Sequence, residues 1–308
     1  MHVVMMGTGA LGGLFAHHLA LGGAQVLGVD NAPTHLAAMQ AHGLRVRSAE
    51  GDVRSPIPAF AATPPARVAD VLVCFVKGFG TVAAMAAARP AIGPNTLLVT
   101  LQNGLGNAQA IADAFPGNPV LYGLTTLTSD LVAPGVIEPL STAAGNTDLW
   151  GDTDAARRQG AAFVDVLQRG GIAARLAPDI TLSIWKKLAV NCALNPLCAL
   201  TGLRCGDLVD LPAMVPAIDT IVDEVARVAQ ALGVPLPADM ARAYVHQVAQ
   251  ASRRHYPSMA IDVRHGRRTE IETLCGAVLR EADRLNLSAP GLRQAYALVS
   301  ALDARLAS

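Results

Sequence analysis

Short apolar runs alternate with helical patterns through the first half of the chain. Residues 2–6 form a short apolar run, and an apolar helical pattern through Leu14, Phe15 and Leu21 follows it. A helix is also expected over 81–88. Further strands or extended segments are expected at 25–30, 68–76, 96–101, 120–127, 147–150 and 171–176. Alternation of this kind is typical of a doubly wound α/β domain built on a parallel sheet.

The pattern changes after Pro178 to long helical segments without a convincing strand. The main helices are expected over 181–194, 216–232, 237–252 and 269–285. Thr269 and Glu272 have the spacing of a capping box at the start of the last one. Pro196 is expected to end or kink the first one. The sequence therefore predicts an α/β domain over 1–177 and an all-helical domain over 178–308.

A glycine-rich turn lies between the first strand and the first helix. Gly7 permits a tight turn, Gly9 lets the backbone approach a pyrophosphate, and Gly12 allows the helix to pack closely on the strand. A helix that starts directly after such a turn offers amide donors and a positive dipole to an anion. We therefore predict a dinucleotide site formed by Gly7, Thr8, Gly9, Ala10, Leu11 and Gly12.

The second predicted strand ends in an acidic residue, Asp30, which is followed by Asn31. An acid at this place accepts hydrogen bonds from the adenosine ribose and repels a 2′-phosphate. Two such charges about 4 Å apart would repel by about 4 kcal/mol at an effective dielectric near 20. Asp30 and Asn31 are thus expected to contact the cofactor and to favour NADH. The alternative is that Asp30 points to solvent and discriminates nothing.

Three polar side chains share one stripe of the first helix after Pro178. Lys187, Asn191 and Asn195 are four residues apart, so on a helix they lie one above the next. Apolar residues surround them, and a proton donor with two amides suits a small polar substrate in an apolar pocket. The alternative is an ordinary amphipathic helix with a polar edge. Lys187 is favoured over Lys186 because only Lys187 shares the stripe.

The amino-acid composition limits the classes of function that are expected. The 24 basic and 24 acidic residues balance, so no nucleic-acid partner is expected. The sequence contains no long uninterrupted apolar stretch, so no membrane span is expected. The N-terminus lacks the basic leader of a signal peptide. Five cysteines without paired spacing suggest reduced core residues in a cytoplasmic protein, and the eight histidines show no metal-ligand spacing. We therefore expect a metal-free cytoplasmic protein.

Several motifs together resemble the ketopantoate reductase (2-dehydropantoate 2-reductase) family over essentially the whole chain. The segment Trp-Lys-Lys-Leu-Ala-Val-Asn-Cys-Ala-Leu-Asn-Pro at 185–196, in register with Ser258 and Glu270, is highly specific. The other matching segments are 7–12, 76–77, 102–106, 257–259 and 268–272.

The resemblance implies a Rossmann-type dinucleotide-binding domain followed by an all-α domain like the C-terminal domain of 6-phosphogluconate dehydrogenase. The implied reaction is NAD(P)H-dependent reduction of a 2-keto acid, here ketopantoate to pantoate on the pantothenate and coenzyme A route. Members of the family usually use NADPH, whereas Asp30 favours NADH. A monomer or homodimer is expected, with a small 2-keto acid as the only other partner.

The resemblance also implies roles for individual residues. Lys187 would be the general acid, and Glu270 would hold it in position and bind the substrate hydroxyl. Asn191, Asn195 and Ser258 would bind the carboxylate and hydroxyl groups of the substrate. Asn103 and Lys77, which follow two neighbouring strands, would line the junction between nicotinamide and substrate.

Simpler interpretations stay open for four of these residues. Asn103 could be a turn residue before Gly104, and Lys77 a solvated strand end. Glu270 could simply favour a helix N-terminus, and Ser258 could be an N-cap.

Two other functions are also open. One is an NADH-dependent D-2-hydroxyacid dehydrogenase for another branched or aromatic 2-keto acid, which Asp30 and the departures from the family pattern at Cys205 and His255 favour. The other is a nicotinamide nucleotide sensor without turnover.

Overall fold

The buried apolar runs of the first half form the strands of one eight-stranded sheet. The computed structural model describes residues 1–48, 51–62, 67–140, 146–178 and 180–306. Hydrogen-bonded neighbours follow the order β12–β11–β8–β7–β6–β1–β2–β5, and every pair is parallel except β11 with β8. The strands are β1 (His2–Met6), β2 (Gln25–Val29), β5 (Ala59–Phe60), β6 (Val71–Cys74), β7 (Leu97–Thr100), β8 (Val120–Thr125), β11 (Asn146–Trp150) and β12 (Ala173–Leu176).

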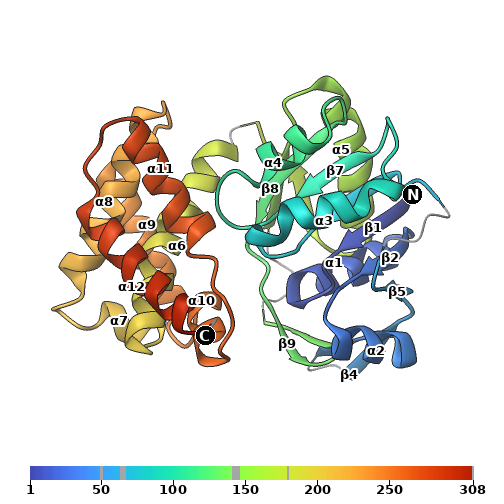
Figure 1. Cartoon of the computed structure of the whole chain (residues 1–308), viewed down its shortest axis with the longest axis horizontal. Helices are drawn as coiled ribbons and strands as arrows, with labels where there is room; N and C mark the ends of the chain where they lie inside the picture. Colours follow the sequence, from blue (N-terminus) through green and yellow to red (C-terminus); the bar gives the residue numbers. More distant parts are fainter. Residues whose placement is uncertain (49–50, 63–66, 141–145, 179, 307–308) are drawn as a thin grey trace. The chain divides into compact units, whose positions relative to one another are not determined.

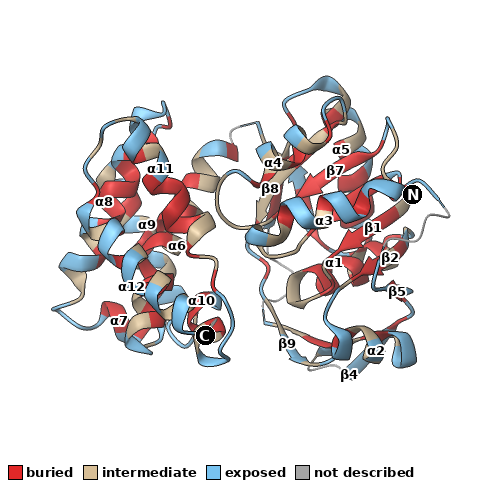
Figure 2. Cartoon of the chain, in the orientation of Figure 1, coloured by how far each residue is buried: buried red, intermediate tan, exposed pale blue. Residues whose placement is uncertain are grey.

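Helices cover both faces of this sheet (Figure 1), which confirms the predicted α/β class. On one face, Val3 and Met5 of β1 pack with helices α1 (Ala10–Leu21) and α5 (Asp154–Arg169). On the other face, Val4 and Met6 pack with helices α3 (Thr81–Ala88) and α4 (Asn107–Ala114). Because successive side chains of a strand point to opposite faces, one apolar run serves two cores. The central strands are accordingly buried throughout (Figure 2).

A second, four-stranded sheet was not predicted from the sequence. Its order is β4–β3–β10–β9, and helix α2 (Pro33–His42) leads into it. The strands are β3 (Leu44–Ser48), β4 (Gly51–Ser55), β9 (Ser129–Ala133) and β10 (Val136–Pro139). Charged and small residues interrupt each of these short segments, so they lack the continuous apolar run that marks a fully buried strand.

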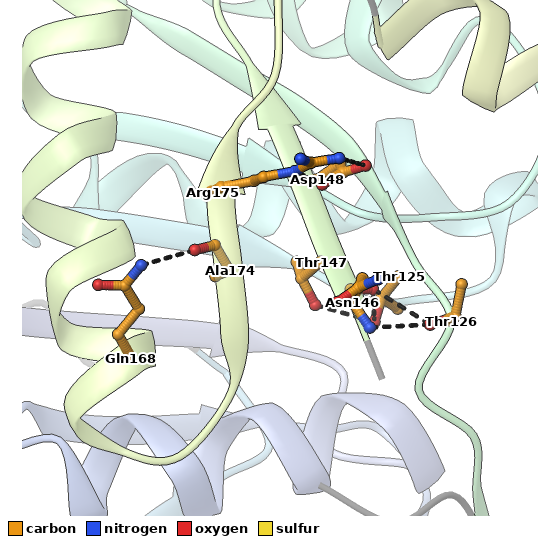
Figure 3. A network of polar contacts seen from close by, with 8 residues as sticks. All are labelled: Thr125, Thr126, Asn146, Thr147, Asp148, Gln168, Ala174 and Arg175. Atoms are coloured by element: carbon orange, nitrogen blue, oxygen red, sulfur yellow. Dashed lines mark hydrogen bonds and ion pairs between the residues drawn. The ribbon is translucent and has the colours of Figure 1, made fainter. Parts of the chain in front are cut away.

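Polar contacts at the far edge of the large sheet link β8, β11 and β12 (Figure 3). The hydroxyls of Thr125 and Thr147, which are cross-strand partners, lie 3.0 Å apart in the buried interior. Arg175 donates to the Asp148 carboxylate at 2.6 Å, and Gln168 of α5 donates to the Ala174 carbonyl at 2.8 Å. Cross-strand pairs of this kind stabilise the pairing of strands beyond the backbone bonds.

All elements described between residues 180 and 306 are helical, as predicted. They are α6 (Ile180–Thr201), α7 (Cys205–Val209), α8 (Val215–Ala231), α9 (Ala238–Ala251), α10 (Ser258–Arg264), the π-helical turn η3 (Glu272–Gly276), α11 (Ala277–Arg284) and α12 (Pro290–Leu306). Side chains from α6, α8, α9, η3, α11 and α12 share one core.

Of the two outcomes expected at Pro196, an end or a kink of the helix, the first is wrong, because helix α6 continues to Thr201. Proline has no N–H, so the carbonyl of Cys192, four residues earlier, loses its usual helical donor. The thiol of Cys275, in η3, points at that carbonyl at 3.7 Å. The helix is therefore continued with a side-chain donor in place of the missing backbone bond.

The predicted capping box at Thr269 is also wrong. Its backbone N–H donates to the carboxylate of Asp303 on α12 at 3.0 Å, and its hydroxyl donates to the same group at 2.8 Å. Glu272 instead accepts the Tyr296 hydroxyl at 2.6 Å and pairs with Arg280. A π-helical turn follows in place of a regular first turn, and π-turns are frequent at functional sites.

The chain divides into two compact units, and both are discontinuous in sequence. The first comprises Met1–Gln102 and Asn107–Ile180, and the second comprises Asn103–Gly106 and Thr181–Ser308. A four-residue loop after β7 thus belongs with the helices. No helix in the described part of the chain is both long and apolar enough to cross a membrane.

We predict that Glu224→Gln destabilises the helical unit. Glu224 of α8 is buried, and its two carboxylate oxygens accept the N–H groups of Gly291 and Leu292, in the first turn of α12, at 3.0 and 2.7 Å. An amide cannot accept both bonds and loses the favourable charge at a helix N-terminus. The expected loss is about 1–3 kcal/mol in the free energy of unfolding, measured by urea denaturation with circular dichroism.

Glu281→Gln is the matched control, because Glu281 only forms a partly exposed ion pair with Arg284. Its expected cost is below about 0.5 kcal/mol. Equal costs for the two variants would contradict the capping role of Glu224.

Candidate active site

The glycine-rich turn has the geometry that its sequence predicts. Gly7 has a φ of +89°, which glycine adopts without strain. A Cβ at Gly12 would lie 2.0 Å from the Gly7 carbonyl oxygen, so no larger residue fits there. A Cβ at Gly9, by contrast, would meet nothing within 4 Å, so the backbone here faces open space. The turn therefore leaves room for a ligand beside the N-terminus of α1.

The start of α1 offers backbone donors to an anion. Gly9 is its N-cap, no side chain forms a capping hydrogen bond, and the first turn contains no acidic residue. The dipole of the helix is thus not offset by a local carboxylate. Ala10 and Leu11, the first two residues of the helix, are partly buried. These features fit the pyrophosphate of a dinucleotide.

Asp30 follows β2 and is held by three hydrogen bonds. The N–H and the hydroxyl of Thr8 donate to its Oδ2 at 2.8 and 3.0 Å, and the Ala32 N–H donates to its Oδ1 at 3.0 Å. The carboxylate is therefore turned towards the glycine-rich turn. The alternative that Asp30 points to solvent is not what the structure shows, whereas Asn31 beside it is exposed.

The loops after β6 and β7 are tied together by Gln102, a residue to which the sequence analysis assigned no role. Its amide donates to the Val76 carbonyl at 2.6 Å and to the Thr81 hydroxyl at 2.9 Å. Its own oxygen accepts the Thr100 hydroxyl at 2.9 Å. Lys77, partly buried, lies between Val76 and the short 3₁₀ turn η1 (Gly78–Gly80). Gln102 thereby fixes the backbone that carries Lys77, and its sequence signal was its place before Asn103 in the family-like segment 102–106.

In the helical unit, the predicted stripe lies on one continuous helix. Lys187, Asn191 and Asn195 all fall within α6, and the helix has no break between them. Lys187 and Asn191 are partly buried, and Asn195 is buried. The neighbouring Leu188, Cys192 and Leu194 belong to the core of the unit. The three polar groups are therefore aligned along the helix, with apolar packing beside them.

Burial and one neighbouring charge set the proton affinity of Lys187. Burial lowers the pKa of its ammonium group to about 8, because a charged amine loses hydration there. The negative charge of Glu270 acts in the opposite direction and raises that pKa. Glu270 therefore lies close enough to Lys187 for a direct electrostatic interaction. Near neutral pH the side chain is still mostly an ammonium group, yet it can release its proton readily.

Lys186 is directed elsewhere. Its Nζ lies over the ring of Tyr244, on α9, 5.4 Å from the ring centroid, which is a cation–π geometry. Lys187, by contrast, interacts with Glu270 and shares the helix face of Asn191. The preference for Lys187 as the site lysine, which spacing suggested, stays a prediction.

The loop that carries Asn103 is seated on the turn that follows Glu270. Gly104 has a φ of +89°, and a Cβ there would lie 2.1 Å from the Thr273 carbonyl oxygen. That carbonyl accepts the Leu105 N–H at 3.2 Å. Glycine at 104 is thus required both for the backbone conformation and for the close approach. The structure brings Asn103 to the Glu270 segment of the helical unit.

Ser258 is the first residue of α10 and is exposed, whereas the N-cap is Pro257. The simpler interpretation of Ser258 as an N-cap therefore does not apply. Its place beside a substrate stays a prediction.

Within the described ranges no three His, Cys, Asp or Glu residues gather as metal ligands would. The five cysteines are all buried free thiols, as expected of reduced core residues.

The chain matches two family descriptions that together span most of its length. Residues 3–150 match "Ketopantoate reductase PanE/ApbA", and residues 179–303 match "Ketopantoate reductase PanE/ApbA C terminal". A 2-dehydropantoate 2-reductase of Halobacterium salinarum is 34% identical over 97% of this chain and 98% of its own. One of Vibrio cholerae is 31% identical over 98% of each chain.

Solved structures extend the likeness to three dimensions. D-mandelate dehydrogenase in a ternary complex with NADH and anilino(oxo)acetate superposes with a TM-score of 0.94, at 25% identity over 99% of each chain. A ketopantoate reductase of Ralstonia eutropha superposes with a TM-score of 0.90, at 29% identity over the whole of both chains. With matches over both of its parts and relatives above 30% identity along nearly all of its length, this chain belongs to the ketopantoate reductase family.

Proposed function

We propose that this protein reduces 2-dehydropantoate (ketopantoate) to pantoate with a nicotinamide dinucleotide. The observation that carries the proposal is the α6 stripe, in which a lysine with a pKa of about 8 interacts with Glu270 and is aligned with two asparagines. The relatives named 2-dehydropantoate 2-reductase, at 34% and 31% identity over nearly the full chain, support the choice of substrate.

The chemistry of the stripe suits ketone reduction. A reduced nicotinamide, when bound, supplies the hydride that forms the new C–H bond at the ketone carbon. The ammonium group of Lys187 donates a hydrogen bond to the ketone oxygen and stabilises the negative charge that develops on it. Lys187 then gives the proton from its Nζ to that oxygen, which completes the hydroxyl group. Glu270 keeps Lys187 charged and oriented by its opposite charge.

The remaining polar groups are suited to holding the substrate. Asn191 and Asn195 offer amide donors to its carboxylate, and Asn103 and Ser258 offer further hydrogen bonds to its hydroxyl and keto groups. Each of these side chains belongs to the helical unit by the division of the chain. A buried amide without its substrate partner disfavours ligands that lack the matching polar group, and this gives selectivity.

The cofactor is proposed to be held by residues 7–12 and Asp30, with Lys77 at the end of the next strand. The glycine geometry at Gly7, Gly9 and Gly12 fits a pyrophosphate. The fixed carboxylate of Asp30 suits free ribose hydroxyls better than a 2′-phosphate, so we propose NADH as the preferred nucleotide.

A second candidate is an NADH-dependent D-2-hydroxyacid dehydrogenase for a bulkier 2-keto acid. The orientation of Asp30 favours NADH, and the NADH-bound D-mandelate dehydrogenase superposes with a TM-score of 0.94. The two candidates share the same Lys187 chemistry and differ in the side chain of the substrate.

Initial rates of nucleotide oxidation should decide between them. We expect turnover with ketopantoate that is faster with NADH than with NADPH, measured by nicotinamide absorbance in parallel assays. A higher kcat/KM for a branched or aromatic 2-keto acid would favour the second candidate. Nucleotide binding without turnover on any 2-keto acid would contradict both and indicate a nucleotide sensor.

We predict that Lys187→Ala lowers kcat by about 10²–10⁴-fold, because it removes the proton donor. Lys186→Ala is the control, since Lys186 contacts Tyr244 and lies off the stripe. It should stay within about threefold of the parent kcat, a change well below the loss of a general acid. The affinity for NADH, measured by fluorescence titration, should be nearly unchanged in both variants. An active Lys187→Ala variant would refute the assignment.

The rate of reduction should also depend on pH in one direction. Lys187 acts as an acid, so kcat/KM should be constant at low pH and fall above its pKa of about 8. Since the charge of Glu270 raises that pKa, Glu270→Gln should move the decline to lower pH. pH–rate profiles of both proteins check this. A decline that stays in place or moves upward in the variant would contradict the coupling.

A further inference from the structure

His35 is buried on α2 and connects the glycine-rich turn to the second sheet. Its side chain is 3% exposed. Its Nδ1 lies 3.0 Å from the backbone nitrogen of Gly135, in the turn between β9 and β10. Its Nε2 lies 3.0 Å from the Thr8 carbonyl oxygen and 3.2 Å from the Thr8 hydroxyl. One imidazole therefore contacts two segments that are far apart in sequence.

The contacts determine which ring nitrogen carries the proton. The Gly135 N–H can only donate, so Nδ1 must accept and has no proton. A carbonyl oxygen can only accept, so Nε2 must be the N–H that donates to Thr8. The geometry thus requires the neutral tautomer with its proton on Nε2. A ring protonated at Nδ1 would set two donors against each other.

Thr8, fully buried, passes this constraint on to Asp30. Its N–H and hydroxyl both donate to Asp30 Oδ2, while its carbonyl is bound by His35. Its methyl group fills the space left by Gly28, where a Cβ would lie 2.7 Å from Thr8 Cγ2. Thr8 is therefore held on every side, and its two donors are aimed at one carboxylate oxygen.

The hydrogen bonds to Asp30 leave one of its carboxylate oxygens able to accept a further bond. A carboxylate oxygen accepts about two hydrogen bonds, and Oδ2 receives both of its bonds from Thr8. Oδ1 receives one, from the Ala32 N–H, and keeps capacity for another donor. An adenosine ribose hydroxyl is such a donor, whereas a 2′-phosphate has no proton to give and is repelled.

We propose that His35 is a positioning residue for nucleotide choice: through Thr8 it holds the Asp30 carboxylate in the orientation that accepts a ribose hydroxyl and excludes a 2′-phosphate. This inference rests on the proposed function, because it assumes that a nicotinamide dinucleotide binds at the glycine-rich turn. Without the Nε2 proton the Thr8 carbonyl loses this donor, the Thr8 peptide can turn, and Asp30 loses the alignment of its two bonds.

Two substitutions separate the two contacts of the ring. The amide nitrogen of glutamine can occupy the place of His Nε2, so His35→Gln keeps a donor to Thr8 and loses the acceptor for Gly135. The shorter asparagine places its oxygen near Nδ1, so His35→Asn keeps the acceptor and loses the donor to Thr8. Both lose the ring, and a comparison of their melting temperatures shows how closely their packing defects match.

The measurement is the equilibrium dissociation constant of NADH and of NADPH for each protein, by fluorescence titration without substrate. We expect His35→Asn to weaken NADH binding by about tenfold, the effect of one buried hydrogen bond, with little change for NADPH. The ratio of the two constants should collapse, and we expect the same collapse in Asp30→Ala. His35→Gln should keep the parent ratio within about twofold, by rescue of the Thr8 contact.

A His35→Asn variant could have the same melting temperature as His35→Gln and still keep the parent ratio of NADH to NADPH dissociation constants. That result would overturn the inference and leave the proposed function intact. A parent protein that binds neither nucleotide would instead refute the proposed function. If neither variant folds, nitrogen-15 NMR of the parent protein decides. The Nε2–H tautomer at His35 supports the inference, and an Nδ1–H tautomer or a charged ring overturns it.

Discussion

The continuity of α6 is the constraint on which the proposed substrate site depends. The three polar side chains proposed to form it stay in line only if the helix holds its pitch from Lys187 to Asn195, and Pro196 removes a hydrogen bond at its end. The Cys275 thiol takes the carbonyl that this proline leaves, and Cys275 belongs to the π-helical turn after Glu270. The segment that follows Glu270 therefore contacts α6 at the carbonyl from which the proline removes the backbone bond.

The proposed cofactor site and the proposed substrate site are built from different groups. The proposed cofactor site consists largely of backbone: glycine conformations, a helix N-terminus and the ends of parallel strands. The proposed substrate site consists of side chains on helices that pack around one core. Backbone geometry recognises what all dinucleotides share, whereas side chains distinguish one acid from another. Substrate choice can thus change without loss of the cofactor fold.

Features with a local period were predictable from the sequence. The strand–glycine–helix turn, the acid that follows β2 and the α6 stripe each follow from spacing within one short stretch of sequence. Features that depend on distant contacts were not. His35 bonds to Gly135, one hundred positions later, and Asp303 takes the role assigned to Glu272 from 34 positions beyond Thr269. The second sheet escaped prediction because its strands are short and charged.

The loop at residues 103–106 has a consequence for how such proteins can be recombined. It is encoded within the α/β part but packs with the helices, where Gly104 fits against Thr273. A chimera made by exchanging everything after residue 180 would combine the 103–106 loop of one parent with the Thr273 turn of the other parent, on which that loop packs. An excised helical fragment would lack Asn103 altogether. A modular swap of substrate specificity must therefore transplant two separate stretches of sequence, and the shorter is only four residues long.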